Sequence, residues 1–450
     1  MLKFLSPELP ESERKKFVFL TFIFFLIVGS YWFIGLLKDT VFFKLAFPAT
    51  LGWPEGYGRL MLPTAKFWSP FFIVTIVLIY SKIVDLVRRH QLFYIFGTLF
   101  IFIFAFTGVI LFLRSINGNE FIGKNLLAFT GWLTFFSTEA FGSLMTAMFW
   151  SFVISISDVN TAKFGFPLIV SGAQVGSITG SACTIIASQL GGVWPLYFVG
   201  CFFISLIILA ISFFVKKYPT KHIATPKKDL GFAGIVEGIR LLVTTPYLLG
   251  IFVISTFYEV SIAVIDYQMR VQADISTSFQ GELGFSLFQT IYGVTANSCA
   301  LIIALFATRY LLKRFGTRLC LLIYPSYFAI SLTALLIYVY FGSFSTTILL
   351  WLTFTILVIA KGLTYGLNNP TKEILYIPTS KDVQFKTKGF TDTFGSRTAL
   401  MAGASISHKF KDNIPKLMSV GTFICLGFVG FWALAAIYVG HKYQELRKKS

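Results

Sequence analysis

The sequence has few charged residues and few of the side chains that bind metals or carry out acid–base chemistry. Only 13% of its 450 residues are charged, and it has 4 histidines and 5 cysteines. The cysteines lie singly in apolar segments, without the spacing of a zinc site or redox pair, so we interpret them as packing residues. The histidines are scattered in predicted loops. An enzyme would be expected to show paired carboxylates, a metal cluster or a nucleophile beside a base. We therefore predict a non-enzyme without metal or cofactor.

Apolar residues, in contrast, are abundant. They make up 56% of the chain, which contains 53 phenylalanines and has a mean hydropathy of +0.75, well above that of a soluble domain. No small-residue cleavage site follows the first apolar run, so we expect that run to remain as a helix. The sequence thus predicts an all-α polytopic membrane protein with about twelve spans: 17–37, 62–81, 92–113, 127–150, 164–189, 194–215, 246–265, 284–307, 319–340, 344–364, 390–407 and 417–439.

The longest basic connection divides these spans into equal groups. Residues 216–231 read "KKYPTKHIATPKKDLG", with six predicted spans before them and six after. We therefore predict an N-terminal six-helix bundle (1–215), a cytoplasmic linker (216–231) and a C-terminal six-helix bundle (232–450). This is the parallel-repeat organisation of major-facilitator-like transporters. In the fifth span, Gly172, Gly176 and Gly180 form a small face that predicts close helix packing.

The formal charge of +18 has an explanation in membrane topology. Most of the 38 lysines and arginines fall in loops on the side that also holds both termini. Cytoplasmic loops carry such an excess, so we place both termini in the cytoplasm and expect no nucleic-acid partner.

Ionisable residues inside the spans are the candidate functional residues. Each costs about 2.5 to 3.5 kcal/mol at mid-bilayer and needs a partner, water or a task. Lys38 and Asp39 close the first span, where the lysine either snorkels to the headgroups or points inward to an anion. Glu139 lies half-way along the fourth span with no basic residue within a turn, so it either lines a cavity or makes a buried hydrogen bond.

The seventh and eleventh spans carry further ionisable residues. Glu259 is followed by Asp266 seven residues on, and Arg270 lies close enough to pair with Asp266. Lys388 and Asp392 share one face of the eleventh span, which is the weakest by hydropathy, and Ser396 and Gly403 lie on a small face of it. We expect this helix to line a transport path.

A polar, lysine-rich segment precedes the eleventh span. It contains Lys372, Lys381, Lys386 and Lys388, with Tyr376 among them. Such a segment either forms a basic vestibule for an anion or is an ordinary positive cytoplasmic loop.

The ordered motifs of the chain resemble the nucleotide transporter family of intracellular bacteria and plastids, the non-mitochondrial ATP/ADP translocases. They are "KD" at 38–39, "LPTAKFW" at 62–68, Glu139 followed by "FW", "TTPYLLGI" leading to "YE" at 258–259, and "NPTKEILYIPTS" with "FKTKG". One departure is that family members commonly place a Trp-Lys pair after the span-seven glutamate, where this chain has "VSIAVIDYQMR".

The resemblance implies ATP:ADP antiport in the inner membrane of an intracellular bacterium by a protein that acts as a monomer. By the resemblance, Lys38, Glu139, Glu259 and Lys388 match charged positions important for transport. Together with the other ionisable residues of the spans, this gives our site prediction: substrate is bound by Lys38, Lys66, Lys388 and Arg397, and gating or coupling involves Asp39, Glu139, Glu259, Asp266 and Asp392. Proton-coupled nucleotide symport and exchange of another phosphorylated organic anion stay open. So does a non-transporting receptor or scaffold on the same fold.

Overall fold

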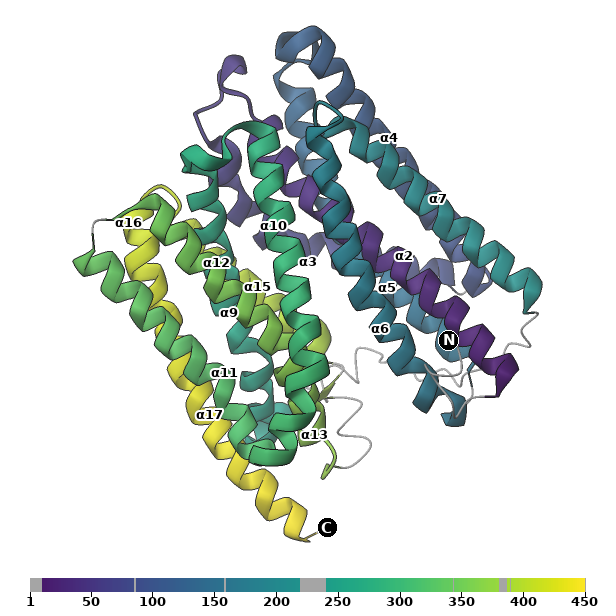
Figure 1. The fold of residues 1–450 in the computed structure, drawn as a ribbon, viewed down its shortest axis with the longest axis vertical. Helices are drawn as coiled ribbons and strands as arrows, with labels where there is room; N and C mark the ends of the chain where they lie inside the picture. The colour runs from purple at the N-terminus through teal and green to yellow at the C-terminus, as the bar shows by residue number, and fades with distance from the viewer. Residues whose placement is uncertain are drawn as a thin grey trace. The chain divides into compact units, whose positions relative to one another are not determined.

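A computed structural model describes residues 10–84, 86–157, 159–218, 240–342, 344–379, 387–388 and 390–449, and these residues form helices and connecting loops without a β-strand. Most of the predicted linker, together with Lys381 and Lys386, lies outside these ranges. Figure 1 shows the arrangement of the helices.

Each predicted span coincides with one helix. In the first half of the chain these are α2 (Glu11–Thr40), α3 (Tyr57–Val84), α4 (Arg89–Ile122), α5 (Lys124–Ser155), α6 (Val159–Cys183) and α7 (Trp194–Lys217). In the second half they are α9 (Pro246–Ile275), α10 (Gly281–Ile302), α11 (Thr308–Phe341), α12 (Thr346–Leu363), α15 (Ser396–Phe410) and α17 (Thr422–Lys449). Two shorter helices, α13 (Asn369–Leu375) and α16 (Ile414–Lys416), connect them.

Within the described ranges, nine segments are long and apolar enough to cross a membrane, and one of them, Gly281–Phe341, includes both α10 and α11. The helices α5 and α15 are not among these segments. In α5 the polar residues around Glu139 lower the hydropathy, and α15 has only 15 residues, several of them polar. Positive φ angles at Gly118 (+82°) and Gly316 (+69°) break α4 and α11, so the straight apolar parts are shorter than the full helices.

Several helices continue through wider π-helical turns. One such turn, η1 (Val41–Leu45), follows α2, and another, η6 (Thr364–Asn368), joins α12 to α13. A third, η7 (Thr391–Gly395), precedes α15. Turns of this kind are frequent at functional sites.

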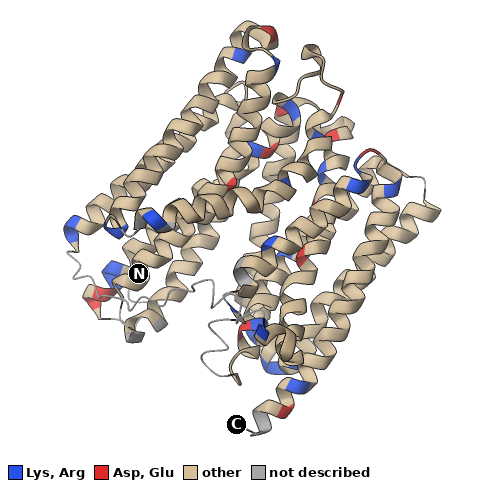
Figure 2. Ribbon diagram, turned by 180° about the vertical axis from the view of Figure 1, so that it is seen from behind, with Lys and Arg blue, Asp and Glu red and all other residues tan. Residues whose placement is uncertain are grey.

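The chain forms two compact units. The first comprises Met1–Ala65, Phe71–Pro226 and Thr277–Val294, and the second comprises Lys66–Pro70, Lys227–Ser276 and Thr295–Ser450. Each unit therefore takes a short segment from the other half of the sequence. Charged residues lie mainly towards helix ends in Figure 2, with a few inside the apolar helices.

In the first unit, α2 packs closely on α6, and α4 lies beside α7 (Figure 1). A Cβ atom at Gly176 would lie 2.4 Å from the Phe25 carbonyl oxygen, and one at Gly180 would lie 2.1 Å from the Gly29 carbonyl oxygen. The prediction that the glycine face of this span packs against a helix is therefore confirmed. Buried phenylalanines fill the rest of this core, as in the stacked pair of Phe24 and Phe149.

In the second unit, α9 is the central helix and packs against α12, α15 and α17. The Gln268 side chain donates to the Leu417 carbonyl at 2.8 Å and to Thr422 at 3.0 Å. Gly403 of α15 faces α9, where an added Cβ would lie 2.8 Å from the Val260 carbonyl oxygen. This packing places α15 next to the ionisable residues of α9.

Candidate functional site

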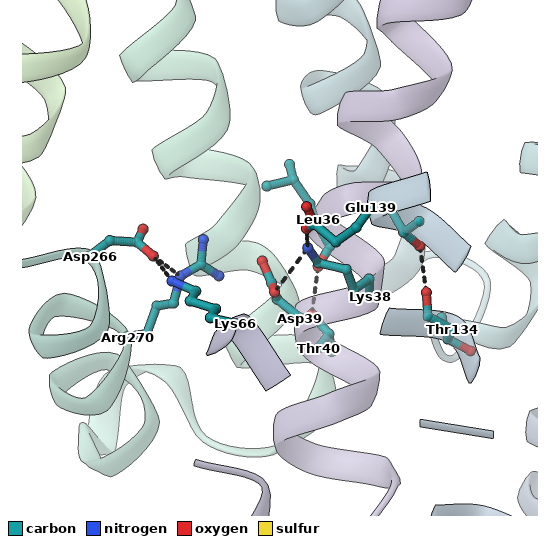
Figure 3. A network of polar contacts seen from close by, with 10 residues as sticks. Leu36, Lys38, Asp39, Thr40, Lys66, Thr134, Glu139, Asp266 and Arg270 are labelled. Atoms are coloured by element: carbon teal, nitrogen blue, oxygen red, sulfur yellow. Dashed lines mark hydrogen bonds and ion pairs between the residues drawn. The ribbon is translucent and has the colours of Figure 1, made fainter. Parts of the chain in front are cut away.

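In the first unit, Lys38 lies at the C-terminal end of α2 and points inward. Its side chain is about 10% exposed and forms an ion pair with Glu139 of α5 (Figure 3). A carboxylate oxygen of Asp39 lies 3.9 Å from the same ammonium nitrogen. The ammonium group also lies 4.5 Å from the centre of the Phe135 ring. One cation is thus held by two carboxylates and an aromatic face, and the inward alternative for Lys38 is the observed one.

Lys38, the cation that pairs with Glu139, lies 101 positions away along the chain. Neighbouring threonines on α5 bond to their own helix, as Thr138 does to the Thr134 carbonyl at 2.7 Å. They therefore do not compete for the carboxylate.

In the second unit, Asp266 of α9 lies between two cations (Figure 3). One carboxylate oxygen, Oδ2, accepts from Lys66 Nζ at 2.6 Å and from Arg270 Nε at 2.9 Å. The exposed fractions of these side chains are 13% for Asp266, 25% for Lys66 and 10% for Arg270. The pairing of Asp266 with Arg270 agrees with their four-residue spacing.

Lys361 of α12 belongs to the same group of charges. It interacts electrostatically with Asp266, Arg270 and Lys66, and its ammonium group lies 5.9 Å from the centre of the Tyr365 ring. We did not identify Lys361 as a site residue from the sequence. The available signal was its position inside the predicted span 344–364, but a lysine near the end of a span is equally typical of a snorkelling side chain.

Glu259 lies in a polar pocket two turns before Asp266 on α9. It accepts hydrogen bonds from Ser396 of α15 and from Tyr258, the latter at 3.1 Å. The pocket has a volume of about 210 Å³ and is lined by residues of α9, η6, α13, η7 and α15: Ser255, Tyr258, Glu259, Thr364, Tyr365, Asn369, Lys372, Thr391 and Ser396.

Polar atoms in this pocket have unused hydrogen-bonding capacity. Among the described residues, the hydroxyl oxygens of Ser255 and Thr391 and the amide oxygen of Asn369 are buried without a partner. Buried polar groups are normally satisfied by protein or water, so these atoms indicate a site for a polar ligand or for water. The side chains of Lys372 and Arg397 add positive charge near Glu259.

The remaining predicted site residues lie elsewhere. Lys388 donates to Glu373 at 2.5 Å, and the two side chains are 38% and 48% exposed, so the pair lies at the surface. Asp392 is the second residue of η7, after Thr391, but its side chain lies outside the described part of the structure. Within the described residues, no group of three histidine, cysteine or acidic side chains is placed to hold a metal ion.

Comparison with known proteins identifies the family. Residues 7–443 match the TLC ATP/ADP transporter family. The chain belongs to this family. The chloroplastic ADP,ATP carrier protein 2 of Arabidopsis thaliana is 24% identical, over 94% of this chain and 74% of its own. ADP,ATP carrier protein 1 of Chlamydia trachomatis is 24% identical, over 88% of this chain and 81% of its own. The corresponding protein of Rickettsia typhi is 23% identical, over 98% and 95%.

Solved structures agree on the architecture. A bacterial homologue of the iron transporter ferroportin superposes with a TM-score of 0.63 at 12% identity, covering 96% of this chain and 100% of its own. The POT family transporter PepTSo gives a TM-score of 0.60 at 14% identity, covering 97% and 99%. At such identities the likeness shows the fold alone. This member of the TLC family is thus a multi-pass membrane protein with a major-facilitator-like fold, and its family is one of transporters, not enzymes.

Proposed function

We propose that this TLC family member exchanges ATP for ADP across the inner membrane of an intracellular bacterium, by alternating access and as a monomer, with both termini in the cytoplasm. The observation that carries the proposal is that a member of an ATP/ADP transporter family buries cations inside its apolar helices. Lys38 and Lys66 are each held there by a carboxylate. Buried charges of this kind mark substrate or ion pathways.

The site residues take the following roles in this proposal. Lys38, Lys66, Lys388 and Arg397 bind the phosphates, because lysine and arginine are strong charge-assisted donors to phosphate oxygens. Asp39, Glu139, Glu259, Asp266 and Asp392 gate or couple transport by pairing with these cations and releasing them. The ion pair between Lys38 and Glu139 supports this assignment, since it joins two helices distant in sequence. Phosphate is a further candidate substrate.

Uptake of labelled ATP into intact bacterial cells that express the chain tests the proposal. We expect accumulated label to be released by external ADP, with little effect of a protonophore. Entry that a protonophore stops and that ADP does not reverse would instead establish proton-coupled symport. No uptake of any nucleotide would overturn both. Where ATP is taken up, competition by unlabelled solutes would show whether another phosphorylated organic anion is preferred.

One observation favours symport as the second candidate. Glu259 lies on α9, which is apolar enough to span a membrane. The carboxylate of Glu259 accepts hydrogen bonds from the hydroxyl groups of Ser396 and Tyr258. A carboxyl group that accepts hydrogen bonds from hydroxyl groups inside a span is a candidate proton carrier.

A further inference from the structure

A cluster of four basic residues lies where the chain passes from α10 to α11. Arg309, Lys313, Arg314 and Arg318 fall within ten residues, directly before the apolar part of α11. Residues 283–372 contain no aspartate or glutamate, so no acidic residue is near the cluster in sequence. In space, none of the four pairs with a carboxylate among the residues that the structure describes. Within this part of the chain, the positive charge of the cluster is thus not neutralised.

The backbone sets this basic segment apart from the apolar helix that follows it. A π-helical turn, Ile303–Ala307, precedes the segment, and Gly316 interrupts the helix with a φ of +69° and a ψ of 170°. Apolar side chains are exposed on both sides, Phe306 to 74% before the segment and Leu319 to 51% after it. In a multi-pass membrane protein such exposed apolar side chains contact lipid. The segment 308–315 is therefore a short basic helix at the membrane boundary.

Two aromatic rings hold the guanidinium group of Arg314 in this short helix. The group lies 5.7 Å from the centre of the Tyr310 ring and 5.8 Å from that of the Phe315 ring, and it donates to the Tyr310 hydroxyl. The two aromatic side chains are 54% and 43% exposed. Amphipathic rings such as tyrosine concentrate at the level of the lipid headgroups. Arg314 is therefore oriented where a headgroup would lie.

The fourth cation joins the segment to the C-terminal helix. Helix α11 packs against α17 (Figure 1), and the guanidinium group of Arg318 donates to Nε2 of His441 at 2.5 Å. A Cβ atom at Gly440 would lie 2.9 Å from Cγ of Arg318, so the arginine stem lies against α17. Arginine has five N–H donors, and the imidazole nitrogen accepts only one hydrogen bond, so Arg318 has donors left for another acceptor. Basic pockets between membrane helices are typical sites for anionic headgroups.

We propose that the segment 308–318, together with the adjoining part of α17, binds the headgroup of an anionic phospholipid. Guanidinium groups bind phosphate oxygens in a bidentate manner, and Arg314 and Arg318 are both held in place for this contact. The exposed apolar side chains on either side of the segment receive the acyl chains, which a free phosphate ion lacks. Membrane topology alone accounts for positive charge near a span, but not for guanidinium groups fixed on rings and against α17. This inference is independent of the substrate in the proposed function.

The experiment measures thermal stabilisation of the purified, detergent-solubilised full chain by phosphatidylglycerol and by phosphatidylcholine with the same acyl chains. Stabilisation rises with the ratio of ligand concentration to dissociation constant, so it reports affinity. We expect phosphatidylglycerol to raise the melting temperature more than phosphatidylcholine does, and equal effects would overturn the proposal. The double variant Arg314→Gln, Arg318→Gln should lower the apparent affinity for phosphatidylglycerol about tenfold, because it removes both ordered guanidinium groups.

The matched control removes the same charge from another part of the same unit. Lys409 at the end of α15 and Lys416 in α16 are both exposed. The double variant Lys409→Gln, Lys416→Gln should bind phosphatidylglycerol as wild type does. Equal losses of affinity in the two double variants would show that net charge alone attracts the lipid, and the proposed site would be wrong.

Two further measurements keep the test decisive. Inorganic phosphate at the same concentration should not stabilise the chain, and stabilisation equal to that by phosphatidylglycerol would contradict a lipid site. Should the first double variant not fold, Arg309→Gln, Lys313→Gln replaces it, because both side chains are exposed and neither pairs with a described carboxylate. This variant should weaken phosphatidylglycerol binding about threefold, and an unchanged affinity would count against the proposal.

Discussion

The two units treat buried charge in opposite ways. In the first, the cation Lys38 pairs with two carboxylates, Glu139 and Asp39. In the second, the carboxylate of Asp266 pairs with two cations, Lys66 and Arg270. In the proposed mechanism, an arriving polyphosphate has to displace Glu139 and Asp39 from Lys38 in the first site, and Asp266 from Lys66 in the second. The comparison indicates that each lysine is available to phosphate only when its own carboxylate partner releases it.

We expect the largest effect on exchange when Lys38 is removed from the first site. Lys38→Ala leaves two carboxylates in an apolar unit without their cation, which should reduce exchange more than a hundredfold and destabilise the fold by about 3–5 kcal/mol. Exchange in proteoliposomes and the melting temperature measure the two effects. The double variant Lys38→Gln, Glu139→Gln should regain most of the stability but not the exchange. Recovery of exchange as well would show that the ion pair is structural only.

The next prediction tests whether the packing of α2 against α6 keeps Lys38 in position. At Gly180 an added methyl group would lie 2.1 Å from the Gly29 carbonyl oxygen, so α2 and α6 must separate. We expect Gly180→Ala to cost about 1–3 kcal/mol and to lower exchange through a displaced Lys38. Gly427→Ala is the control, because nothing lies within 4 Å of the corresponding methyl position. Equal melting temperatures for the two variants would contradict the packing argument.

A third substitution tests the role of the Glu259 carboxylate in the second unit. In Glu259→Gln the amide oxygen still accepts from Ser396 and Tyr258, so stability should change by less than about 1 kcal/mol. The charge that balances Lys372 and Arg397 is lost, and exchange should fall about tenfold. Exchange rates and melting temperature again provide the measurement. A large drop in melting temperature would show that the carboxylate acts in folding and not in transport.

The smallest effect is expected at the surface. Lys388 and Glu373 form an exposed pair, and such pairs contribute about 0–1 kcal/mol. Lys388→Gln should leave the melting temperature unchanged and raise the KM for ATP about threefold, because an exposed lysine attracts and binds phosphate only weakly. An unchanged KM, measured by initial uptake rates, would contradict a binding role for Lys388.

The sequence predicted the helices well because long apolar runs are a strong signal, and it predicted the glycine packing face because small residues recur at helical spacing. It also predicted the pair of Asp266 with Arg270, which is local in sequence. The sequence did not predict the ion pairs between residues far apart along the chain. Lys38 and Glu139 are 101 positions apart, and Lys66 and Asp266 are 200 apart, so only tertiary packing selects them. Lys361 was not predicted because a single sequence does not show whether a lysine at the end of a span is buried.

The π-helical turn Thr364–Asn368 determines which residues of its helix work together. It separates Lys361, which faces the charges around Asp266, from Asn369 and Lys372, which line the pocket beside Glu259. Each residue of an α-helix advances the chain by about 100°. Deleting one residue from this turn would therefore rotate Asn369 and Lys372 away from the pocket while leaving Lys361 in place. The π-helical turn thus sets the orientation of Asn369 and Lys372 relative to Lys361.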